Sequence, residues 1–399
     1  MSLAYDLSKR GIAVTDIDKG EIGFGCSYGN AGWLTPCFSM PLPMPGMLLK
    51  SIGWMLDPVG PLHIKPQPSV LLARWLSRFL VSMNTGLMNR SVSALTEISK
   101  YSLDAYAQLD RDYPNTIGFE RKGLLMVAHT KAGVKATLKE MNLVAEHGVP
   151  GRELDAEGIR NLEPALKGNL LGGVYFPEEA HAEPLAIVKT LTAAAIKNGV
   201  QVIPHTEVIS FVVDGRKIKG VNTTKGVITS DQYVLATGSW SAKIGKSLNL
   251  NVPILGGKGY SIIVKPFNPT PKIPIMILER KIAVTPRKDT VRLAGTLELV
   301  NLDESITQKR VDTIIKGSQE FLNVPQNPEI IEVWRGLRPC TPDGVPIIGR
   351  PADYDNLFLA TGHQMLGLQS AMGSARLAAD LLTGTKPIFD PNPFRATRF

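Results

Sequence analysis

The sequence predicts an α/β fold of two lobes, and three features of the chain carry this prediction. Residues 2–18 have the pattern of a helix followed by a strand that ends on Asp18. Residues 233–237 form an apolar run that ends in glycine, as a buried parallel strand does before a ligand-binding loop. Residues 252–300 alternate β-rich runs with prolines, which is typical of an antiparallel sheet in a separate lobe.

The first segment predicts the second half of a dinucleotide-binding βαβ unit. Apolar residues between Ser2 and Leu7 form one helix face, and Gly11 supplies the stop signal. In such units, the acid that ends the second strand bonds the adenosine ribose, about 20 residues after a glycine-rich phosphate turn. Counted back from Asp18, the last glycine of that turn would fall at or before Met1. We therefore expect a Rossmann-like lobe that lacks its first strand and its glycine turn.

The composition indicates a globular protein and favours an anionic partner other than nucleic acid. The chain has 399 residues, with 44% hydrophobic and 20% charged residues, which permits large cores and argues against disorder. The net charge is +8, but the basic residues are scattered, which favours an anionic cofactor, an acidic substrate or a membrane surface over nucleic acid. Three cysteines are too few for a disulfide framework or a zinc site, and they predict a reducing, cytoplasmic location. No metal site is expected.

Periodicity and helix punctuation predict the remaining elements. The proline-rich stretch 36–68 excludes a regular helix and a central strand. Apolar residues at helical spacing predict helices over 70–83, 91–112 and 137–147. The same reasoning predicts a further set of helices, strands and turns: a strand at 123–129, a helix at 184–198, a strand at 201–203, a hairpin through 214–215, a strand at 356–361 and a helix at 373–382.

Four stretches together resemble one flavoprotein family. They are SYGNAG (27–32), ATGSWS (236–241), GLRPCTPDGVPIIG (336–349) and LFLATGHQMLGLQSAMGSA (357–375). In this order and spacing they resemble the D-amino-acid dehydrogenases, glycine oxidases and sarcosine oxidases over nearly the whole chain. Two further stretches look most like the bacterial D-amino-acid and D-hydroxyproline dehydrogenase branch: WMLDPVGPLHIKP (54–66) and GGKGYSIIV (256–264).

The resemblance implies a two-lobed α/β (α+β) fold with non-covalently bound FAD. The Rossmann-like FAD lobe would consist of residues 1–48, 150–240 and 330–399. The substrate lobe would consist of residues 49–149 and 241–329, with an antiparallel sheet that roofs the flavin.

The resemblance also implies which residues bind FAD. Asp18 would accept the ribose hydroxyls, and the backbone of Val208 would pair with adenine. Backbone N–H groups and a small hydroxyl suit a diphosphate, which places the 27–32 loop at the pyrophosphate and the flavin edge. The full set of expected cofactor residues is Asp18, Lys19, Ser27, Asn30, Ala31, Gly32, Val208, Thr237, Gly238, Gly336, Gly362, His363, Gly367 and Leu368.

For the substrate, the resemblance to glycine oxidase implies that Arg338 binds the carboxylate. A guanidinium suits this task, because its planar fork makes two parallel bonds to a carboxylate. The alternative for Arg338 is a structural salt bridge. Tyr260 is expected as a second carboxylate or amine contact and Lys258 as a neighbour of the flavin, and a packing role is equally open for both.

The implied activity is FAD-dependent oxidative deamination of D-amino acids to 2-oxo acids, by hydride transfer from Cα to flavin N5. A D-hydroxyproline or other secondary-amine dehydrogenase is the close alternative. A cofactor-poor homologue, or a subunit completed by a partner chain, is the alternative from another class, and a shortened start of the chain is a third interpretation. The expected partners are a small amino-acid substrate and an electron acceptor, such as a quinone of the respiratory chain. Helix 70–83 either packs in the substrate lobe, which we favour, or lies on an anionic membrane surface.

Overall fold

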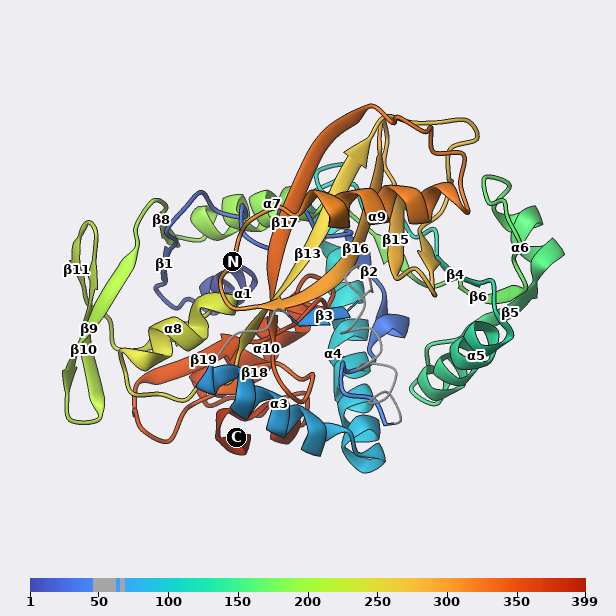
Figure 1. Cartoon of the computed structure of the whole chain (residues 1–399). Coiled ribbons are helices and arrows are strands. Elements are labelled where there is room, and N and C mark those ends of the chain that lie inside the picture. Colours follow the sequence, from blue (N-terminus) through green and yellow to red (C-terminus); the bar gives the residue numbers. More distant parts are fainter. Residues whose placement is uncertain (46–61, 65–68) are drawn as a thin grey trace.

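The computed structural model describes residues 1–45, 62–64 and 69–399, and it has the predicted α/β architecture (Figure 1). A nine-stranded sheet occupies the upper and right parts of the view, and short sheets lie beside α1, α8 and α10. Part of the proline-rich stretch 36–68 and most of the 54–66 segment lie outside the described residues.

The nine-stranded sheet is mainly antiparallel and contains the predicted β-rich region. Its strands follow the order β17-β13-β16-β15-β14-β4-β6-β5, and β3 pairs with β16. In chain order the strands are β3 (Leu62–Ile64), β4 (Leu124–Ala128), β5 (Arg152–Asp155), β6 (Gly172–Phe176), β13 (Leu255–Val264), β14 (Ile275–Ile277), β15 (Ile282–Pro286), β16 (Val291–Val300) and β17 (Ile330–Cys340). The pairings of β13 with β16 and β17, and of β15 with β14 and β16, are antiparallel, as the sequence predicts.

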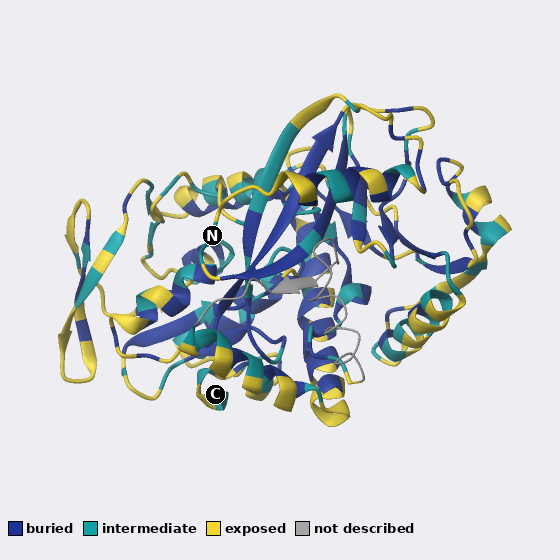
Figure 2. Ribbon diagram, in the orientation of Figure 1, coloured by how far each residue is buried: buried dark blue, intermediate teal, exposed yellow. Residues whose placement is uncertain are grey.

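One face of this sheet is covered by α9 (Gln308–Gln319). Val311, Ile314 and Ile315 on α9 join the apolar core formed by alternate side chains of β13 and β16. Figure 2 shows these two strands as almost continuously buried. Because both faces of β13 are covered, its polar side chains must find partners inside the protein.

The pairing of β5 and β6 bears on the lobe boundaries. Both strands follow residue 150, yet they pair with each other and, through β6, with β4 in the nine-stranded sheet. This pairing indicates that the second segment of the FAD lobe begins after residue 150. The division of the chain into lobes stays a prediction.

The Rossmann-like lobe is divided into two sheets. β1 (Thr15–Ile17) pairs in parallel with β8 (Gln201–Ile203). β12 (Tyr233–Leu235) pairs in parallel with β19 (Leu357–Thr361), whose other neighbour is the antiparallel β18 (Ile347–Gly349). β1 and β12 are edge strands, and no strand in the described part of the chain pairs with both.

The predicted helices are present, and two of them, α4 and α5, begin more than a full turn earlier than expected. The helices near the predicted ranges are α1 (Ser2–Lys9), α3 (Val70–Ser82), α4 (Thr85–Asp112), α5 (Lys131–Ala145), α7 (Pro184–Lys197) and α10 (Ala371–Thr383). α4 begins before residue 91 because the Asn84 side chain accepts from the N–H groups of Gly86 and Leu87. α5 begins before residue 137 because the Thr130 hydroxyl accepts from Gly133 N–H at 2.9 Å.

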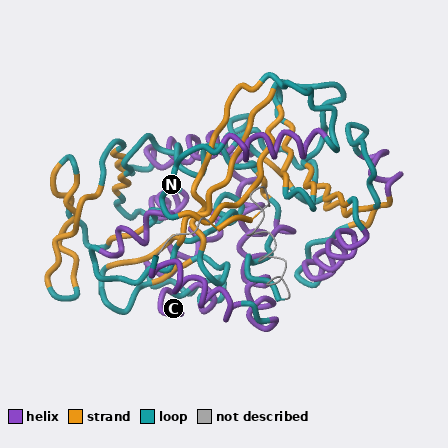
Figure 3. Tube along the Cα trace, in the orientation of Figure 1, coloured by secondary structure: helices purple, strands orange, loops and turns teal. Residues whose placement is uncertain are grey.

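Shorter elements complete the chain, and Figure 3 shows how loops connect them. They are β2 (Trp33–Leu34), α6 (Ala156–Leu162), β7 (Ala180–His181), β9 (Val208–Asp214), β10 (Lys217–Thr223), β11 (Gly226–Ile228) and α8 (Ser241–Lys246). The predicted hairpin through residues 214–215 joins β9 to β10, and it projects at the left of Figure 1.

Candidate active site

A cavity of about 560 Å³ lies where loops of the Rossmann-like lobe meet β13, β16 and β17. Residues at or just after the ends of β12 and β19, Ala236 and Ala360, line one side of it. The following residues expected from the sequence line this cavity: Ser27, Asn30, Ala31, Tyr260, Gly336, Arg338, His363, Gly367 and Leu368. Residues from four distant parts of the chain are therefore brought to one site.

Arg338 is the positively charged side chain on the cavity wall formed by β17. Its Nη1 donates to the carbonyl oxygen of Thr296 at 2.8 Å. No carboxylate in the described part of the chain forms an ion pair with it. Burial lowers the pKa of Arg338, and the groups that oppose this shift are the thiols of Cys340 and Cys26 rather than a carboxylate. Among the described residues, this bond engages one of the five N–H donors of the guanidinium, which leaves the other four for an anionic ligand.

The 26–32 loop presents free backbone donors to the cavity. The Asn30 side chain accepts from Gly32 N–H at 2.8 Å and donates to the Cys26 carbonyl at 3.3 Å, which fixes the loop. The N–H groups of Asn30 and Ala31 have no acceptor within the described residues. Gly32 itself has φ +75 and lies against Ala182, where a Cβ would come within 2.3 Å of the carbonyl oxygen. Its role is therefore to let the loop approach the start of α7.

The loop after β19 presents a second set of donors. Gly362 has φ +81, which turns the chain sharply after the strand. The N–H groups of Gly367 and Leu368 have no acceptor among the described residues, and they precede the N-terminus of α10. The Leu368 carbonyl accepts from Tyr106 Oη at 2.8 Å, so α4 holds this loop in place. Free N–H groups at a helix N-terminus favour a ligand atom with negative charge.

The expected nucleotide residues gather at the ends of β1 and β12, outside the cavity. The Asp18 carbonyl accepts from Thr206 N–H at 2.7 Å, which brings the start of β9, and so Val208, close to Asp18. The Lys19 ammonium lies 3.9 Å from the ring centroid of Trp240, next to the 237–238 turn. Burial raises the pKa of Asp18, and its Oδ1 accepts from Gly20 N–H at 2.9 Å. The FAD contacts of these residues stay predictions.

Lys258 and Tyr260 are held by a buried ionic cluster. Lys258 Nζ lies 3.3 Å from Asp303 Oδ2 and 3.6 Å from Glu298 Oε2, and it does not line the cavity. Tyr260 lines the cavity, but its hydroxyl donates to Glu298 Oε2 at 2.9 Å. Arg310 Nε donates to the other oxygen of Glu298 at 2.8 Å. The contacts fit the packing interpretation for both residues, and their expected contacts with flavin and substrate stay predictions.

His363 lines the cavity as a neutral imidazole. Burial lowers the pKa of His363 to about 4, so the folded protein keeps it neutral at pH 5 while the unfolded chain protonates it below its ordinary value of 6.5. Stability linked to this group is therefore lost as the pH falls from 6.5 toward 4.

We expect the free energy of unfolding of the wild type to drop by about 2 kcal/mol more than that of His363→Asn between pH 7 and pH 5. Urea denaturation of both proteins at both pH values, with the same excess of FAD, measures this difference. An equal change in the free energy of unfolding of the two proteins between pH 7 and pH 5 would contradict the neutral state of His363.

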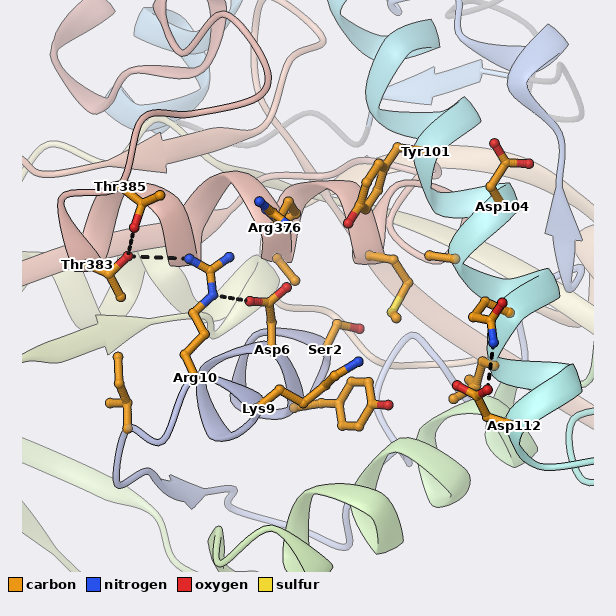
Figure 4. Close-up of a pocket in the computed structure, with 17 residues that line it drawn as sticks. Ser2, Asp6, Lys9, Arg10, Tyr101, Asp104, Asp112, Arg376, Thr383 and Thr385 are labelled. Carbon is orange, nitrogen blue, oxygen red and sulfur yellow. Dashed lines mark hydrogen bonds and ion pairs between the residues drawn. The ribbon is translucent and has the colours of Figure 1, made fainter.

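A larger hollow of about 870 Å³ lies between α1, α4 and α10, and its two arginines, Arg10 and Arg376, are paired with carboxylates (Figure 4). Arg10 donates to Asp6 at 2.6 Å and forms an ion pair with the fully buried Asp380 at 2.8 Å. Arg376 pairs with the same carboxylate at 3.0 Å. These guanidinium groups already have carboxylate partners, unlike Arg338, so the smaller cavity is the better site for an anion.

Some residues of the site carry no signal in the sequence. The buried Arg292 on β16 donates through Nη1 to the Asn30 carbonyl and so supports the 26–32 loop. Trp334 and Gly259 line the cavity beside Arg338. Each of these contacts joins strands and loops that are distant in sequence, so periodicity could not reveal them. The charge of Arg292 between the apolar residues Val291 and Leu293 is a local sign that was open to interpretation.

The cavity fits the isoalloxazine end of FAD, judged by its own residues. It has free N–H donors on two loops, an apolar wall and a volume within the usual range for cofactor sites. Ser27, Asn30 and Ala31 would hold the ring edge and the ribityl chain, and Gly367 and Leu368 would hold the polar edge of the ring.

Comparison with known proteins agrees with this geometry. A family model described as FAD dependent oxidoreductase matches residues 1–381. A D-amino acid dehydrogenase of Bradyrhizobium diazoefficiens is 32% identical over 404 residues, covering 99% of this chain and 95% of that protein. A D-amino acid dehydrogenase of Vibrio atlanticus is 32% identical over 391 residues, covering 96% and 94%.

Solved structures show the same fold. A glycine oxidase from Geobacillus kaustophilus superposes with a TM-score of 0.80 at 21% identity, covering 100% of this chain and 95% of that one. An L-proline dehydrogenase from P. horikoshii gives a TM-score of 0.78 at 20% identity, with coverage of 98% and 93%. Because the family model matches residues 1–381 of the 399 residues in this chain, the chain belongs to the FAD-dependent oxidoreductases.

Proposed function

We propose that this protein oxidises D-amino acids to 2-oxo acids and ammonia with FAD as its cofactor. The observation that carries the proposal is the Arg338 guanidinium, which lines the cavity and has no carboxylate partner within the described residues. A guanidinium that lines a cavity and has no carboxylate partner within the described residues can bind the carboxylate of a ligand. The D-amino acid dehydrogenases among the relatives support the choice of D-amino acids as the substrate class.

The residues of the cavity position the substrate rather than perform acid–base chemistry. The guanidinium of Arg338 would bind both carboxylate oxygens and so fix Cα within the cavity. When bound, FAD supplies the acceptor for the hydride from Cα. The amine nitrogen also loses a proton, and water then hydrolyses the C=N bond, which gives the 2-oxo acid and ammonia. The N–H groups of Gly367 and Leu368 would stabilise negative charge at the polar edge of the ring.

A panel of matched enantiomers tests the proposal. The FAD-loaded protein is given D- and L-alanine, D- and L-methionine, D- and L-phenylalanine, D-proline and D-hydroxyproline, with an artificial electron acceptor. We expect turnover of the D enantiomers only. A preference for D-proline and D-hydroxyproline would favour the secondary-amine alternative. Absence of turnover with every D-amino acid, or a purified protein without flavin absorption after loading, would overturn the proposal.

The electron acceptor and a membrane contact belong to the same proposal. α3 packs through Trp75 and Phe79, which are 1% and 9% exposed. Its outer face exposes Val70 and Val81, at 70% and 76%, together with Arg74. Among the described helices, none combines the length and apolarity needed to cross a bilayer. The contacts of Trp75 and Phe79 with β13 and β16 support the packing role favoured from the sequence. We propose in addition that the exposed outer face of α3 contacts an anionic membrane that holds a quinone acceptor, as basic amphipathic helices do.

Flotation with vesicles measures this contact. We expect the protein to float with vesicles that contain phosphatidylglycerol at low salt and to be released as salt is added. Arg74→Glu should reduce the floated fraction, whereas Lys309→Glu, which makes the same charge change on the exposed surface of α9, should not. A wild-type protein that stays unbound at low salt removes the membrane contact from the proposal.

A further inference from the structure

The side chains of Arg338 and Trp334 pack against two paired glycines of the sheet. Gly259 on β13 pairs directly with Gly336 on β17. A Cβ at Gly259 would lie 1.9 Å from Arg338 Nη1 and 2.3 Å from Cζ, and a Cβ at Gly336 would lie 2.1 Å from the ring of Trp334. Two glycines therefore leave the space in which the side chains of Arg338 and Trp334 lie flat.

The end of the guanidinium is held by an irregularity in the neighbouring strand. Between the pairs Lys258–Glu298 and Tyr260–Gly295, one residue of β13, Gly259, faces two residues of β16. These two residues, Thr296 and Leu297, form a β-bulge. Bulges are over-represented beside active sites, where they redirect a backbone or side-chain group.

Thr296 takes a backbone conformation that a threonine rarely adopts. Its φ is +61, in the left-handed region that a β-branched residue populates at a cost. The same residue offers its carbonyl oxygen to Arg338 Nη1 at 2.8 Å. The bulge thus turns a carbonyl away from the sheet ladder and toward the guanidinium. A carbonyl acceptor holds the group without cancelling its charge, which leaves the charge for a ligand.

We propose that Gly259 and the Thr296 bulge form a cradle that positions the Arg338 guanidinium for the substrate carboxylate. The inference rests on the proposed function and extends it to two residues that line the cavity and act through Arg338. Gly259 supplies the space, and the Thr296 carbonyl sets the rotation of the fork, so that its remaining N–H groups face the cavity. Both are positioning residues.

Gly259→Ala tests the cradle, because the added methyl group overlaps the far end of a flexible side chain and displaces it. We expect KM for a D-amino acid to rise by about tenfold or more while kcat at saturation changes by less than about threefold. The inhibition constant of 2-methylpropanoate, which keeps the carboxylate and lacks the amine, should rise by the same factor. Gly317→Ala is the control. Gly317 lies on α9, and its Cβ would meet the side-chain end of Ile282, Cδ1, at 2.6 Å, without contact to Arg338 or to the bulge.

A double-mutant cycle with Arg338→Ala separates positioning from general damage. If Gly259 acts through Arg338, Gly259→Ala adds no further rise in KM or in the inhibition constant once Arg338 is alanine. Should Gly259→Ala alone fail to fold, the double variant, which lacks the overlapping atoms, is expected to fold, and that rescue supports the contact.

Three results would overturn the cradle. One is an unchanged inhibition constant in Gly259→Ala while Arg338→Ala weakens inhibition. Another is an equal rise of KM in Gly317→Ala and Gly259→Ala. The third is additivity of Gly259→Ala and Arg338→Ala. An Arg338→Ala enzyme with unchanged KM is a different result, since it places the carboxylate elsewhere and removes the proposed function together with the cradle.

Discussion

Arg338→Ala is expected to raise KM for D-amino acids by about tenfold or more in the FAD-loaded enzyme. Charge-assisted bonds to a carboxylate contribute about 1.5–3 kcal/mol each, and about 1.4 kcal/mol corresponds to a tenfold change in affinity. The guanidinium has no carboxylate partner in the described part of the chain. The substitution therefore removes a ligand contact and does not leave a carboxylate of the protein without its ion-pair partner. Steady-state kinetics with D-alanine at saturating electron acceptor measures the effect.

Two further variants give this result its meaning. Arg338→Lys keeps the charge but loses the planar fork, so its KM should lie between those of the wild type and Arg338→Ala. Arg335→Ala is the control on the same strand, because Arg335 already pairs with Glu304 at 3.1 Å and should leave KM nearly unchanged. An unaltered KM in Arg338→Ala would show that the carboxylate binds elsewhere.

The sequence allowed most of the secondary structure to be predicted, for a physical reason. Helix caps, glycine stops and apolar periodicity are local signals, and α7 and β8 begin and end at or within a residue of their predicted limits. The residues after β1, β12 and β19 were assigned to FAD from the resemblance to a flavoprotein family. In the structure, His363, Gly367 and Leu368 after β19 line the cavity, whereas the expected nucleotide residues after β1 and β12 lie outside it, and their FAD contacts stay predictions.

Contacts across the nine-stranded sheet were beyond such reasoning. Tyr260 and Lys258 were expected near substrate and flavin from their motif, but the motif does not reveal which strand supplies their neighbour. That neighbour is Glu298 on β16, about 40 residues later in the chain, and it engages both side chains. A one-residue bulge at Thr296 changes the register in this region, and no turn or repeat in the sequence marks it.

The same cluster predicts the largest effect on stability. Glu298 is 6% exposed and contacts two cations that are 2% exposed, Lys258 and Arg310. Removal of one partner from a buried ion pair costs about 3–5 kcal/mol, because a charge stays in a poorly solvated place. We expect the free energy of unfolding of Glu298→Ala to fall by about 3 kcal/mol, at the lower end of this range, since Asp303 still lies 3.3 Å from Lys258. Urea denaturation at fixed FAD concentration measures the loss.

An exposed ion pair provides the comparison for this prediction. Glu320 pairs with Arg280 at 2.6 Å, with side chains 44% and 47% exposed, so Glu320→Ala should cost less than about 1 kcal/mol despite its shorter contact. Glu298→Gln keeps one oxygen to accept from Arg310, and its NH2 group can donate to the Tyr260 hydroxyl, so its loss of stability should lie between those of the two alanine variants. Equal losses of unfolding free energy in Glu298→Ala and Glu320→Ala would show that burial does not determine how strongly the ionic cluster stabilises the fold. The contact with Glu298 would then not explain why Lys258 lies outside the cavity.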